Sequence, residues 1–305
     1  MTSANNKITP LISICIPTYN RSTCLRQALQ SIVAQSTFRN SELIEIVICD
    51  NFSSDETHKV ASEYTAQYPS KITYFKNKEN VGAETNCAVA MMHGKGEYLK
   101  LYNDYLFSVD GFLDDLVNVL NAVKDEKPVV LLTNGNVTSN TTLKVCNTLD
   151  ELVGSASYYI TWIASIGFWK TDFSEMKDYL NYISNIATHL PQTYYLLDNF
   201  CKGKRAIVLT KNYFLIINPG KKSGYNVAEV FGKNYLHILK KYLSLKLLSE
   251  EVFQKEKRDV LLKYIIPNYF DKSNNLTKNG FFKYLIDYAN DEYFYMEIEN
   301  LIINR

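Results

Sequence analysis

Apolar positions in the first half of the chain fall into short runs that each end in a polar turn. Residues 11–16 and 43–49 are mostly apolar, and each run is followed by polar residues and then by apolar residues at helical spacing. Apolar runs that alternate with amphipathic helices are typical of a parallel sheet covered by helices. The carboxyl ends of such strands meet at one edge of the sheet, so a ligand crevice is expected there.

The remaining elements follow the same alternation. Further strands are predicted at 72–75, 97–102, 128–133 and 165–170, and helices at 21–35, 54–68, 83–92, 110–123, 172–182 and 193–201. Residues 134–160 are rich in Thr, Asn and Ser, which predicts loops or edge strands over the crevice. The segments 206–210 and 213–217 are predicted as a hairpin or as paired edge strands. The sequence thus predicts an α/β fold with a mainly parallel central sheet.

Residues 218–224 (NPGKKSG) interrupt the periodic pattern with a proline and two glycines. We therefore predict an α/β domain over 1–218 and a helical extension over 219–305. In the extension, Tyr235, Lys240, Lys241 and Tyr242 are expected on an exposed face. Such a basic face would rest on the inner surface of the cell membrane or form a homodimer interface, and the sequence leaves both open.

Composition narrows the class of protein further. The hydrophobic fraction of 46% and the charged fraction of 21% are ordinary for a soluble globular protein, and the net charge of +1 gives no overall bias toward nucleic acid. No apolar run reaches the roughly 18 residues of a membrane span, and residues 1–10 lack the apolar core of a signal peptide. The chain is therefore expected in the cytoplasm. Its six cysteines include no Cys-x-x-Cys pair, which favours reduced core thiols over a zinc site or disulfides.

Four motifs occur in order between residues 16 and 104. They are residues 16–21 (IPTYNR), 47–55 (VICDNFSSD), 80–82 (NVG) followed by Asn86, and 96–104 (GEYLKLYND). Together they resemble glycosyltransferase family 2, over roughly residues 11–125. The resemblance implies the GT-A fold, a Rossmann-like domain that binds a nucleotide-sugar donor, with a UDP-sugar as the first candidate. It also implies transfer to a saccharide or lipid-linked saccharide acceptor, in capsule or O-antigen-type lipopolysaccharide synthesis.

The resemblance also assigns a donor site. It places the donor against Pro17, Thr18, Tyr19, Arg21, Asp50, Asn51, Asn80, Gly82, Asn86, Asn103 and Asp104. The composition of residues 221–226 predicts either a loop that closes over the diphosphate with Lys221 and Lys222, or a plain interdomain linker. A carboxylate such as Asp50 can accept a hydrogen bond from N3 of a uracil ring, although a turn or helix cap would also explain it. The guanidinium of Arg21 suits phosphate oxygens, or else serves the start of its own helix.

Family members usually carry an Asp-x-Asp motif whose last carboxylate holds a divalent cation. In this chain the same register places Asn103 and Tyr105 on the two acidic positions. Two alternatives follow. Asp104 would bind Mg²⁺ or Mn²⁺ if the loop is shifted by one residue, since these ions prefer oxygen ligands. Otherwise cationic side chains, such as Lys221 and Lys222, would compensate the charge of the leaving diphosphate.

An inverting transferase needs a base for the acceptor hydroxyl. The resemblance places an acidic pair about eleven residues before a glycine, but counting back from Gly203 reaches Gln192. His189 is the expected substitute, because its ordinary pKa suits proton transfer near neutrality, and Asp198 is the alternative. Either residue would also fit a purely structural position, and a retaining enzyme would need no such base. Trp162, Phe168 and Trp169 are expected near the acceptor, either stacked on a sugar or packed in the core.

The altered motif at 103–105 leaves a rival hypothesis, a catalytically inactive protein that binds nucleotide sugars or acts as a scaffold. A dinucleotide-dependent oxidoreductase is excluded, because the turn after the first strand has no G-x-G-x-x-G motif.

Overall fold

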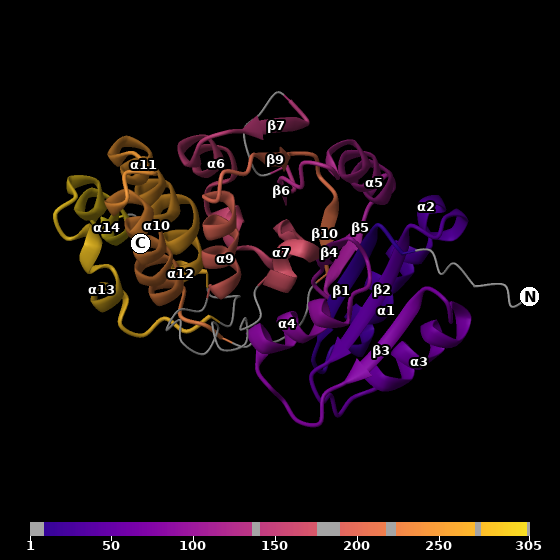
Figure 1. Ribbon diagram of the computed structural model, residues 1–305. Coiled ribbons are helices and arrows are strands. Elements are labelled where there is room, and N and C mark those ends of the chain that lie inside the picture. The colour runs from indigo at the N-terminus through magenta and orange to yellow at the C-terminus, as the bar shows by residue number, and fades with distance from the viewer. Residues whose placement is uncertain (1–8, 136–140, 176–189, 218–223, 272–275, 304–305) are drawn as a thin grey trace, which may run out of the picture.

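The computed structural model describes residues 9–135, 141–175, 190–217, 224–271 and 276–303. A layered α/β part that begins near the N-terminus lies beside a group of helices that ends at the C-terminus (Figure 1). Strands β6, β7 and β9 lie in the upper part of the same view, between these two parts.

A mainly parallel sheet forms the centre of the α/β part. Its strands are β1 (Ile12–Thr18), β2 (Ile44–Asp50), β3 (Ile72–Lys76), β4 (Tyr98–Leu101) and β8 (Gly167–Trp169), in the order β3-β2-β1-β4-β8. The first four are parallel, and β8 pairs antiparallel with β4. The predicted parallel sheet is thus confirmed, and the carboxyl ends of β1, β2, β3 and β4 meet at one edge.

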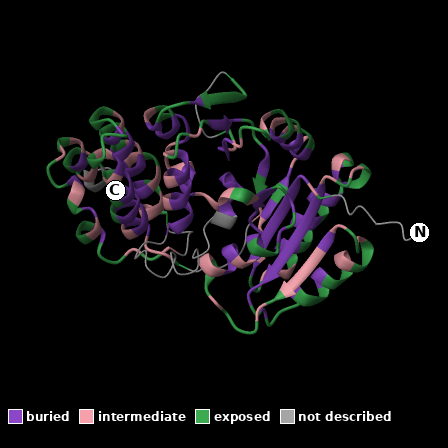
Figure 2. Cartoon of the chain, viewed as in Figure 1, coloured by how far each residue is buried: buried purple, intermediate pink, exposed green. Residues whose placement is uncertain are grey.

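The central strands are buried on both faces (Figure 2), as their nearly continuous apolar runs predict. Alternate residues point to opposite sides. Ile14 and Ile46 belong to a core shared with α1 (Ser22–Val33), whereas Cys15 and Cys49 belong to a second core shared with α4 (Ala83–His93). The other helices of this part are α2 (Ser36–Asn40), α3 (Thr57–Gln67) and α5 (Phe112–Val123). All six cysteines are free thiols.

Gly94 follows the last residue of α4, His93, as its C-cap. Its backbone is extended rather than left-handed. A Cβ on Gly94 would lie 2.6 Å from a Leu99 methyl group, and one on Gly96 would lie 2.6 Å from the Ser13 backbone nitrogen. Close packing against β1 therefore explains both glycines, because a side chain has no room there.

Two smaller sheets complete the α/β part. One is β6 (Val129–Leu132), β9 (Ala206–Leu209) and β7 (Leu143–Cys146), in the order β6-β9-β7, and the other pairs β5 (Leu106–Ser108) with β10 (Phe214–Ile216). Since β9 and β10 belong to different sheets, the predicted hairpin over 206–217 is wrong. β9 is the middle strand of its sheet, between β6 and β7, so the alternative of paired edge strands does not hold for β9 either.

Residues 134–160 contain more structure than the sequence predicted. The edge strand β7 is there, but α6 (Leu149–Ala156) and the 3₁₀ turn η1 (Ser157–Thr161) follow it. A capping box begins α6: the Thr148 side chain accepts from the Glu151 NH, and the Glu151 carboxylate accepts from the Thr148 NH. The Thr-x-x-Glu pattern is a helix-start signal. The prediction of loops or edge strands followed the polar composition of the segment and not this helix-start signal.

The remaining elements are mainly helices, and those after residue 224 agree with the predicted helical extension. In chain order, the remaining elements are η2 (Ile163–Ser165), α7 (Lys170–Glu175), α9 (Pro191–Phe200), the π-helix η3 (Ala228–Tyr235), α10 (Leu236–Ser244), α11 (Glu250–Val260), η4 (Leu261–Ile265), α12 (Ile266–Phe270), α13 (Phe281–Tyr284), η5 (Ile286–Tyr288) and α14 (Glu292–Ile303). Residues 176–182 of the helix predicted at 172–182 lie outside the described residues.

The C-terminal helices share one hydrophobic core with the α/β part. Leu239 of α10 and Val260 of α11 belong to the same cluster as Leu152 of α6 and Leu196 of α9. The boundary predicted at 218/219 falls outside the described residues, and the division into two domains stays a prediction.

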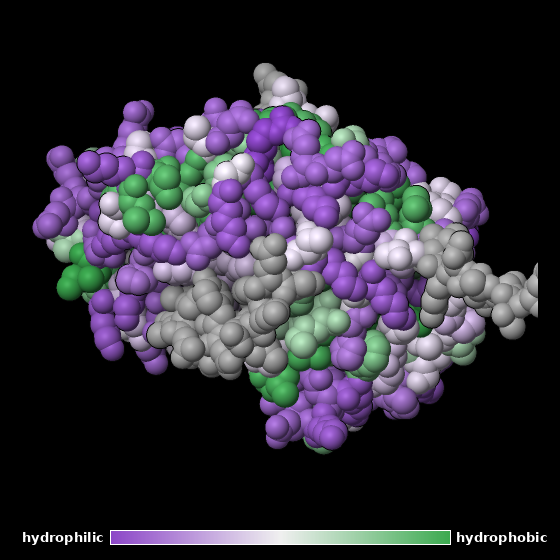
Figure 3. Space-filling view, in the orientation of Figure 1, coloured by the Kyte–Doolittle hydropathy of each residue, from purple (hydrophilic) through white to green (hydrophobic). Residues whose placement is uncertain are grey.

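The exposed Tyr/Lys face expected on the extension is wrong. Tyr235 is 0% exposed and Tyr242 is 1% exposed, because both rings pack in the shared core. Lys240 pairs with Asp287, and Lys241 pairs with Asp198. The large exposed apolar side chains of this part are Leu245, Leu247, Phe282, Ile286, Tyr295 and Met296. Figure 3 shows mixed hydrophilic and hydrophobic patches over the C-terminal helices. No helix within the described ranges is both long and apolar enough to span a bilayer.

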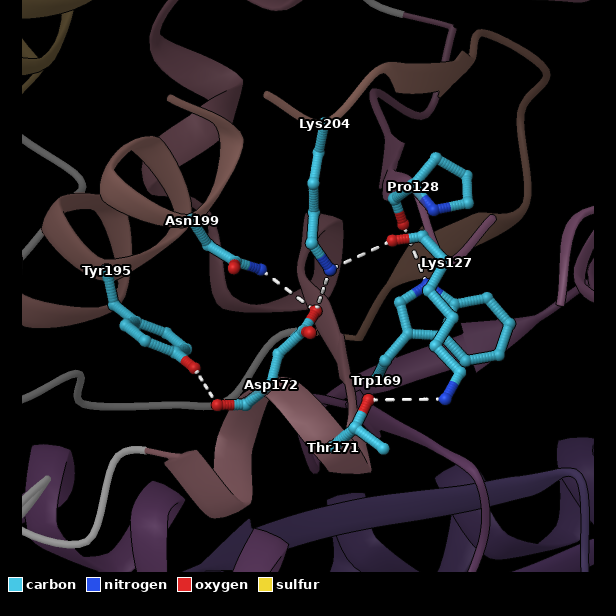
Figure 4. Close-up of polar contacts among 8 residues, drawn as sticks. All are labelled: Lys127, Pro128, Trp169, Thr171, Asp172, Tyr195, Asn199 and Lys204. Carbon is cyan, nitrogen blue, oxygen red and sulfur yellow. Dashed lines mark hydrogen bonds and ion pairs between the residues drawn. The ribbon is translucent and has the colours of Figure 1, made fainter. Parts of the chain in front are cut away.

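A polar cluster around Asp172 fixes α9 against the sheets (Figure 4). The Asp172 carboxylate accepts from Lys204 Nζ at 2.5 Å and from Asn199 Nδ2 at 3.0 Å, while the Tyr195 hydroxyl donates to the Asp172 backbone oxygen. Lys204 also donates to the Lys127 carbonyl, at the start of β6. Since Tyr195 and Asn199 lie in the middle and the last turn of α9, this cluster holds the second half of that helix.

Candidate functional site

The tips of β1 and β4 are joined by a buried carboxylate. Asp104 follows β4, and its side chain is 1% exposed. One Asp104 oxygen accepts from the Thr18 hydroxyl at 2.8 Å, and the other lies 3.0 Å from Arg21 Nη1. Arg21 also lies over the Tyr105 ring, with its guanidinium carbon 5.4 Å from the ring centroid. The predicted residues Thr18, Arg21 and Asp104 are therefore brought together.

Burial and pairing act in opposite directions on Asp104. Burial raises the pKa of its carboxyl group above the ordinary value, and Arg21 and Thr18 partly offset this because they stabilise the ionised form. The Arg21 side chain keeps a quarter of its surface exposed, so a cation at the tip of β1 remains accessible.

Asp50, at the end of β2, is wholly buried. One carboxylate oxygen accepts from the Ser53 backbone NH at 2.8 Å, and the other accepts from the Tyr74 hydroxyl at 2.8 Å. The Asn51 NH donates to the Thr18 carbonyl, which links this turn to the tip of β1. The structure thus places Asp50 beside the Thr18 turn, where its partners fix the turn after β2.

A network of amide side chains joins the tips of β2 and β3. Asn51 Nδ2 donates to Asn80 Oδ1 and to the Gly82 carbonyl, and Asn51 Oδ1 accepts from the Val81 NH. Asn86 Nδ2 donates to the Cys49 carbonyl in the same region. Gly82 has φ of +87°, which favours glycine over any other residue. The predicted residues Asn51, Asn80, Gly82 and Asn86 therefore form one connected group.

Two aromatic side chains are exposed at the same edge. Tyr19 is 44% exposed and Phe52 is 52% exposed, whereas Pro17 is half-buried at the end of β1. Asn20 and Phe52 both have positive φ values, and the Asn20 side chain accepts from the Ser54 NH. Strained turns of this kind are often found at functional sites. Sequence reasoning identified Tyr19 and missed Phe52, whose only signal is a large apolar residue in a polar turn.

A cavity of about 950 Å³ lies next to this edge, between the sheet and the C-terminal helices. Aromatic side chains dominate its wall, from Tyr105, Tyr158, Tyr159, Trp162, Tyr225, Phe231, Tyr264 and Tyr284. Asn103 contributes from the tip of β4, and Glu84 from the start of α4. Asn103 is the one predicted donor residue within the described ranges that lines the cavity. The other predicted donor residues that the structure describes lie at the strand tips beside it.

The Asn103 side-chain oxygen is buried and has no hydrogen-bond partner, alone among the buried side-chain nitrogen and oxygen atoms that the structure describes. A buried acceptor without a donor is costly, so a bound group that donates a hydrogen bond is favoured there. Because Asn103 lines the cavity, this oxygen can serve a group bound there.

The expected Mg²⁺ or Mn²⁺ would use oxygen ligands at 103–105. Asn103 offers one neutral amide oxygen, whereas both oxygens of Asp104 are held by Thr18 and Arg21. Within the described residues, no three His, Cys, Asp or Glu side chains gather around a common point. The turn therefore does not fit a divalent cation in this arrangement, since a metal at Asp104 requires Arg21 to move away. The metal expectation stays a prediction.

The predicted acceptor-side residues do not lie together. Trp162 lines the cavity, as does Gln192 at the position where an acid was sought, whereas Phe168 and Trp169 are buried in the core. Asp198 lies on α9, where it accepts from Lys241 and from the Tyr242 hydroxyl. His189, Lys221 and Lys222 lie outside the described residues. The prediction that each would act in catalysis or donor binding stays untested.

Sequence reasoning missed Glu229. This residue lies on the π-helix η3, and its side chain lines the cavity. Its backbone NH donates to Asn226 Oδ1, but its carboxylate has no hydrogen bond or ion pair among the described residues. The only available signal was that Glu229 is the single acid in the basic stretch from Lys202 to Lys246.

A known family model matches the first part of the chain. Residues 13–143 match the family model described as Glycosyl transferase family 2. Over 122 residues the chain is 33% identical to the abequosyltransferase RfbV of Salmonella typhimurium, which covers 40% of this chain and 35% of RfbV. The chain therefore spans about a third of the length of the curated relatives it matches first.

Solved structures match more of the chain at lower identity. A structure of Staphylococcus aureus TarS in complex with UDP-GlcNAc is 16% identical, with a TM-score of 0.62, covering 85% of this chain and 74% of TarS. The mannosyltransferase PcManGT from Pyrobaculum calidifontis, in complex with GDP-Man and Mn²⁺, is 14% identical, with a TM-score of 0.56, covering 85% of this chain and 73% of PcManGT. At such identities the likeness concerns the fold, and it confirms the GT-A fold.

Proposed function

Because residues 13–143 match the model of glycosyltransferase family 2, we propose that this chain transfers a sugar from a nucleoside diphosphate donor to a saccharide or lipid-linked saccharide. We further propose a UDP-sugar as donor and a role in capsule or O-antigen-type polysaccharide synthesis. TarS binds UDP-GlcNAc and RfbV is an abequosyltransferase, which supports a sugar nucleotide here. The cytoplasm remains the proposed location, with contact at the inner membrane face or a homodimer as additional proposals.

One observation carries the proposal: a cation, two exposed aromatic rings and an amide network surround the tips of parallel strands beside a large cavity. Arg21 supplies the charge for the diphosphate, because guanidinium geometry suits phosphate oxygens. Tyr19 and Phe52 offer faces on which the base can stack. The Asp50 turn and the Asn51, Asn80, Gly82 and Asn86 group would fix the backbone around the base and ribose.

The proposed reaction places the donor at the strand tips and the acceptor in the cavity. Asn103 and Asp104 follow β4 directly, so they lie at the junction of the two sites. Arg21 would stabilise the charge that develops on the leaving diphosphate. Lys221, Lys222 or a divalent cation remain alternative sources of this stabilisation, and His189 remains an alternative base.

Donor binding is tested by thermal unfolding with UDP-, dTDP-, GDP- and CMP-sugars, each with and without Mn²⁺. A ligand that binds the folded protein raises the melting temperature, and we expect the largest rise for a UDP-sugar. Replacing Arg21 with Ala should reduce that rise. Absence of a rise with every donor would refute the proposal.

The rival proposal, an inactive nucleotide-sugar-binding or scaffold protein, is separated by turnover. An active transferase slowly hydrolyses its donor when no acceptor is present, and release of the nucleoside diphosphate measures this rate. Donor binding without any release of nucleoside diphosphate would favour the binding protein, which the altered residues at 103–105 support.

A further inference from the structure

The cavity wall has the chemistry of a saccharide site. Its aromatic rings come from both parts of the molecule: Tyr105 and Trp162 from the α/β part, and Tyr225 and Tyr264 from the C-terminal part. The hydroxyl groups of Tyr225 and Tyr264 lie 2.9 Å apart. Flat apolar faces with a few polar groups at their edges suit a sugar ring, whose C–H faces stack while its hydroxyls form hydrogen bonds.

Two side chains of the cavity wall have oxygen atoms that can accept hydrogen bonds from a ligand. They are the Asn103 amide oxygen and the Glu229 carboxylate, neither of which has a side-chain partner among the described residues. No Lys, Arg or His lines the cavity within those residues. A ligand that supplies O–H donors and carries no negative charge fits such a wall, because buried acceptors need donors and a carboxylate repels anions.

From this geometry we propose that the cavity is the acceptor site for an uncharged saccharide and that Glu229 is the base of the transfer. This inference rests on the proposed function. Glu229 takes the proton from the acceptor hydroxyl, and the acceptor oxygen forms the new bond to the anomeric carbon. The bond from that carbon to the diphosphate oxygen breaks, and its electron pair leaves with the nucleoside diphosphate. The product is inverted at the anomeric carbon.

Other candidates for the base are less suited. Gln192 lines the cavity, but an amide does not take up a proton, and its Nε2 donates to the Thr161 carbonyl. Asp198 is already paired with Lys241 and the Tyr242 hydroxyl. Glu84 lies in the first turn of α4 and is already engaged in an interaction of its own. Glu229 lies on a π-helix, a geometry that is frequent at functional sites.

The base is tested with Glu229→Gln, which keeps the shape of the side chain. The probe is whichever UDP-, dTDP-, GDP- or CMP-sugar gives the largest thermal shift, with water as acceptor. We expect kcat to fall about 100-fold or more, with the donor KM unchanged, because general-base catalysis contributes at least this factor. Glu251→Gln is the matched control, since it removes an exposed carboxylate of the C-terminal part that does not line the cavity, and it should retain the wild-type kcat.

The outcomes separate this inference from the proposed function. Wild-type turnover together with an unchanged kcat in Glu229→Gln, or an equal loss in Glu251→Gln, would overturn the base assignment alone. A wild type that neither binds nor hydrolyses any donor would overturn the proposed function, and this inference with it. Equal thermal unfolding of the two variants and the wild type shows that the fold is retained.

The saccharide site has a readout that does not depend on turnover. The chain has two tryptophans, and Trp169 is buried with its indole NH bonded to the Pro128 carbonyl, so Trp162 is the one that reports on the cavity. Methyl glycosides of glucose, galactose, mannose, rhamnose and N-acetylglucosamine serve as probes. At least one should change the tryptophan fluorescence saturably in Trp169→Phe and not in Trp162→Phe, while methyl phosphate should not. A response to methyl phosphate alone, or to none of the glycosides, would refute the site.

Discussion

Arg21 and Asp104 form an ion pair of 3.0 Å between the tips of two neighbouring strands. The residues are far apart in sequence, and Asp104 is almost completely buried while Arg21 reaches solvent. The pair therefore does two things. It compensates a buried carboxylate next to the Thr18 turn, and it holds a guanidinium at the place where the resemblance puts the donor diphosphate.

Replacing Arg21 with Ala should weaken both the fold and donor binding. The variant leaves the buried Asp104 carboxylate with the Thr18 hydroxyl as its remaining side-chain partner, which we expect to lower the free energy of unfolding by about 3 kcal/mol. Urea unfolding measures this change, and the donor KM should rise in parallel. Arg26→Ala on the same helix is the control, because its ion pair with Glu63 is exposed and should matter little. Equal losses in both variants would contradict a special position for Arg21.

Chelation should lower donor turnover by less than tenfold. A divalent cation at Asp104 would have to displace Arg21, and the cost of breaking a buried ion pair opposes this. The measurement compares the rate in EDTA with the rate after Mn²⁺ or Mg²⁺ is added back. A strict requirement for the metal would contradict the expectation. If Arg21→Ala also needed less Mn²⁺ than the wild type, the metal alternative at Asp104 would be favoured.

Tyr74→Phe should destabilise the turn that Asp50 holds. The variant removes the donor to one buried Asp50 oxygen, which we expect to cost about 2 kcal/mol of unfolding free energy. If Asp50 acts through its turn, Tyr74→Phe and Asp50→Asn should raise the donor KM by similar factors. Competition of UMP and of N3-methyl-UMP with the donor separates this role from a direct contact between Asp50 and the base. A preference for UMP that disappears in Asp50→Asn and persists in Tyr74→Phe would favour a direct contact between Asp50 and the base.

The sheet and the grouping of its polar tips could be predicted because local signals carry them. Apolar runs on 12–16 and 44–49 specify strands buried on both faces, and the parallel order brings the turns after them to one edge. The residues around Thr18, Asp50 and Asp104 are accordingly found together. The sequence does not show which carboxylate oxygens already accept hydrogen bonds within the protein, because donors such as Tyr74 come from another strand.

The cavity could not be predicted because segments distant in sequence build it. Glu229 and Asn103 line the same cavity only because the C-terminal helices pack on the α/β part. Tyr235 and Tyr242 were misjudged for the same reason, since helical spacing shows that they share a face but not whether another element covers it. The partner of β10 is β5, more than a hundred residues earlier, and local pairing signals do not contain that information.

Two buried ionisable groups lie outside the proposed site. Lys100 on β4 donates to the carbonyls of Leu101, Ala164 and Ile166, and burial lowers its pKa to about 7. Glu256 on α11 accepts from the Ser157 and Tyr235 hydroxyls, and burial raises its pKa to about 7. Burial therefore shifts each group toward its neutral form relative to the unfolded chain, and the two groups tie the free energy of unfolding to pH with opposite signs.

Glu256→Gln should remove a pH dependence between about pH 4.5 and pH 7. In this window the folded wild type keeps a proton on Glu256 that the unfolded chain releases, so the free energy of unfolding falls as pH rises, by roughly 3 kcal/mol in all. The variant keeps an amide oxygen for Ser157 and Tyr235 but has no proton to lose. Urea unfolding at several pH values should therefore show the free energy of unfolding of the variant rising relative to that of the wild type as pH rises.

Tyr235→Phe is the control, because it keeps the Glu256 carboxyl group and removes a donor to its ionised form, so the pH dependence of this variant should persist. A difference between Glu256→Gln and wild type that stays constant with pH would contradict the raised pKa.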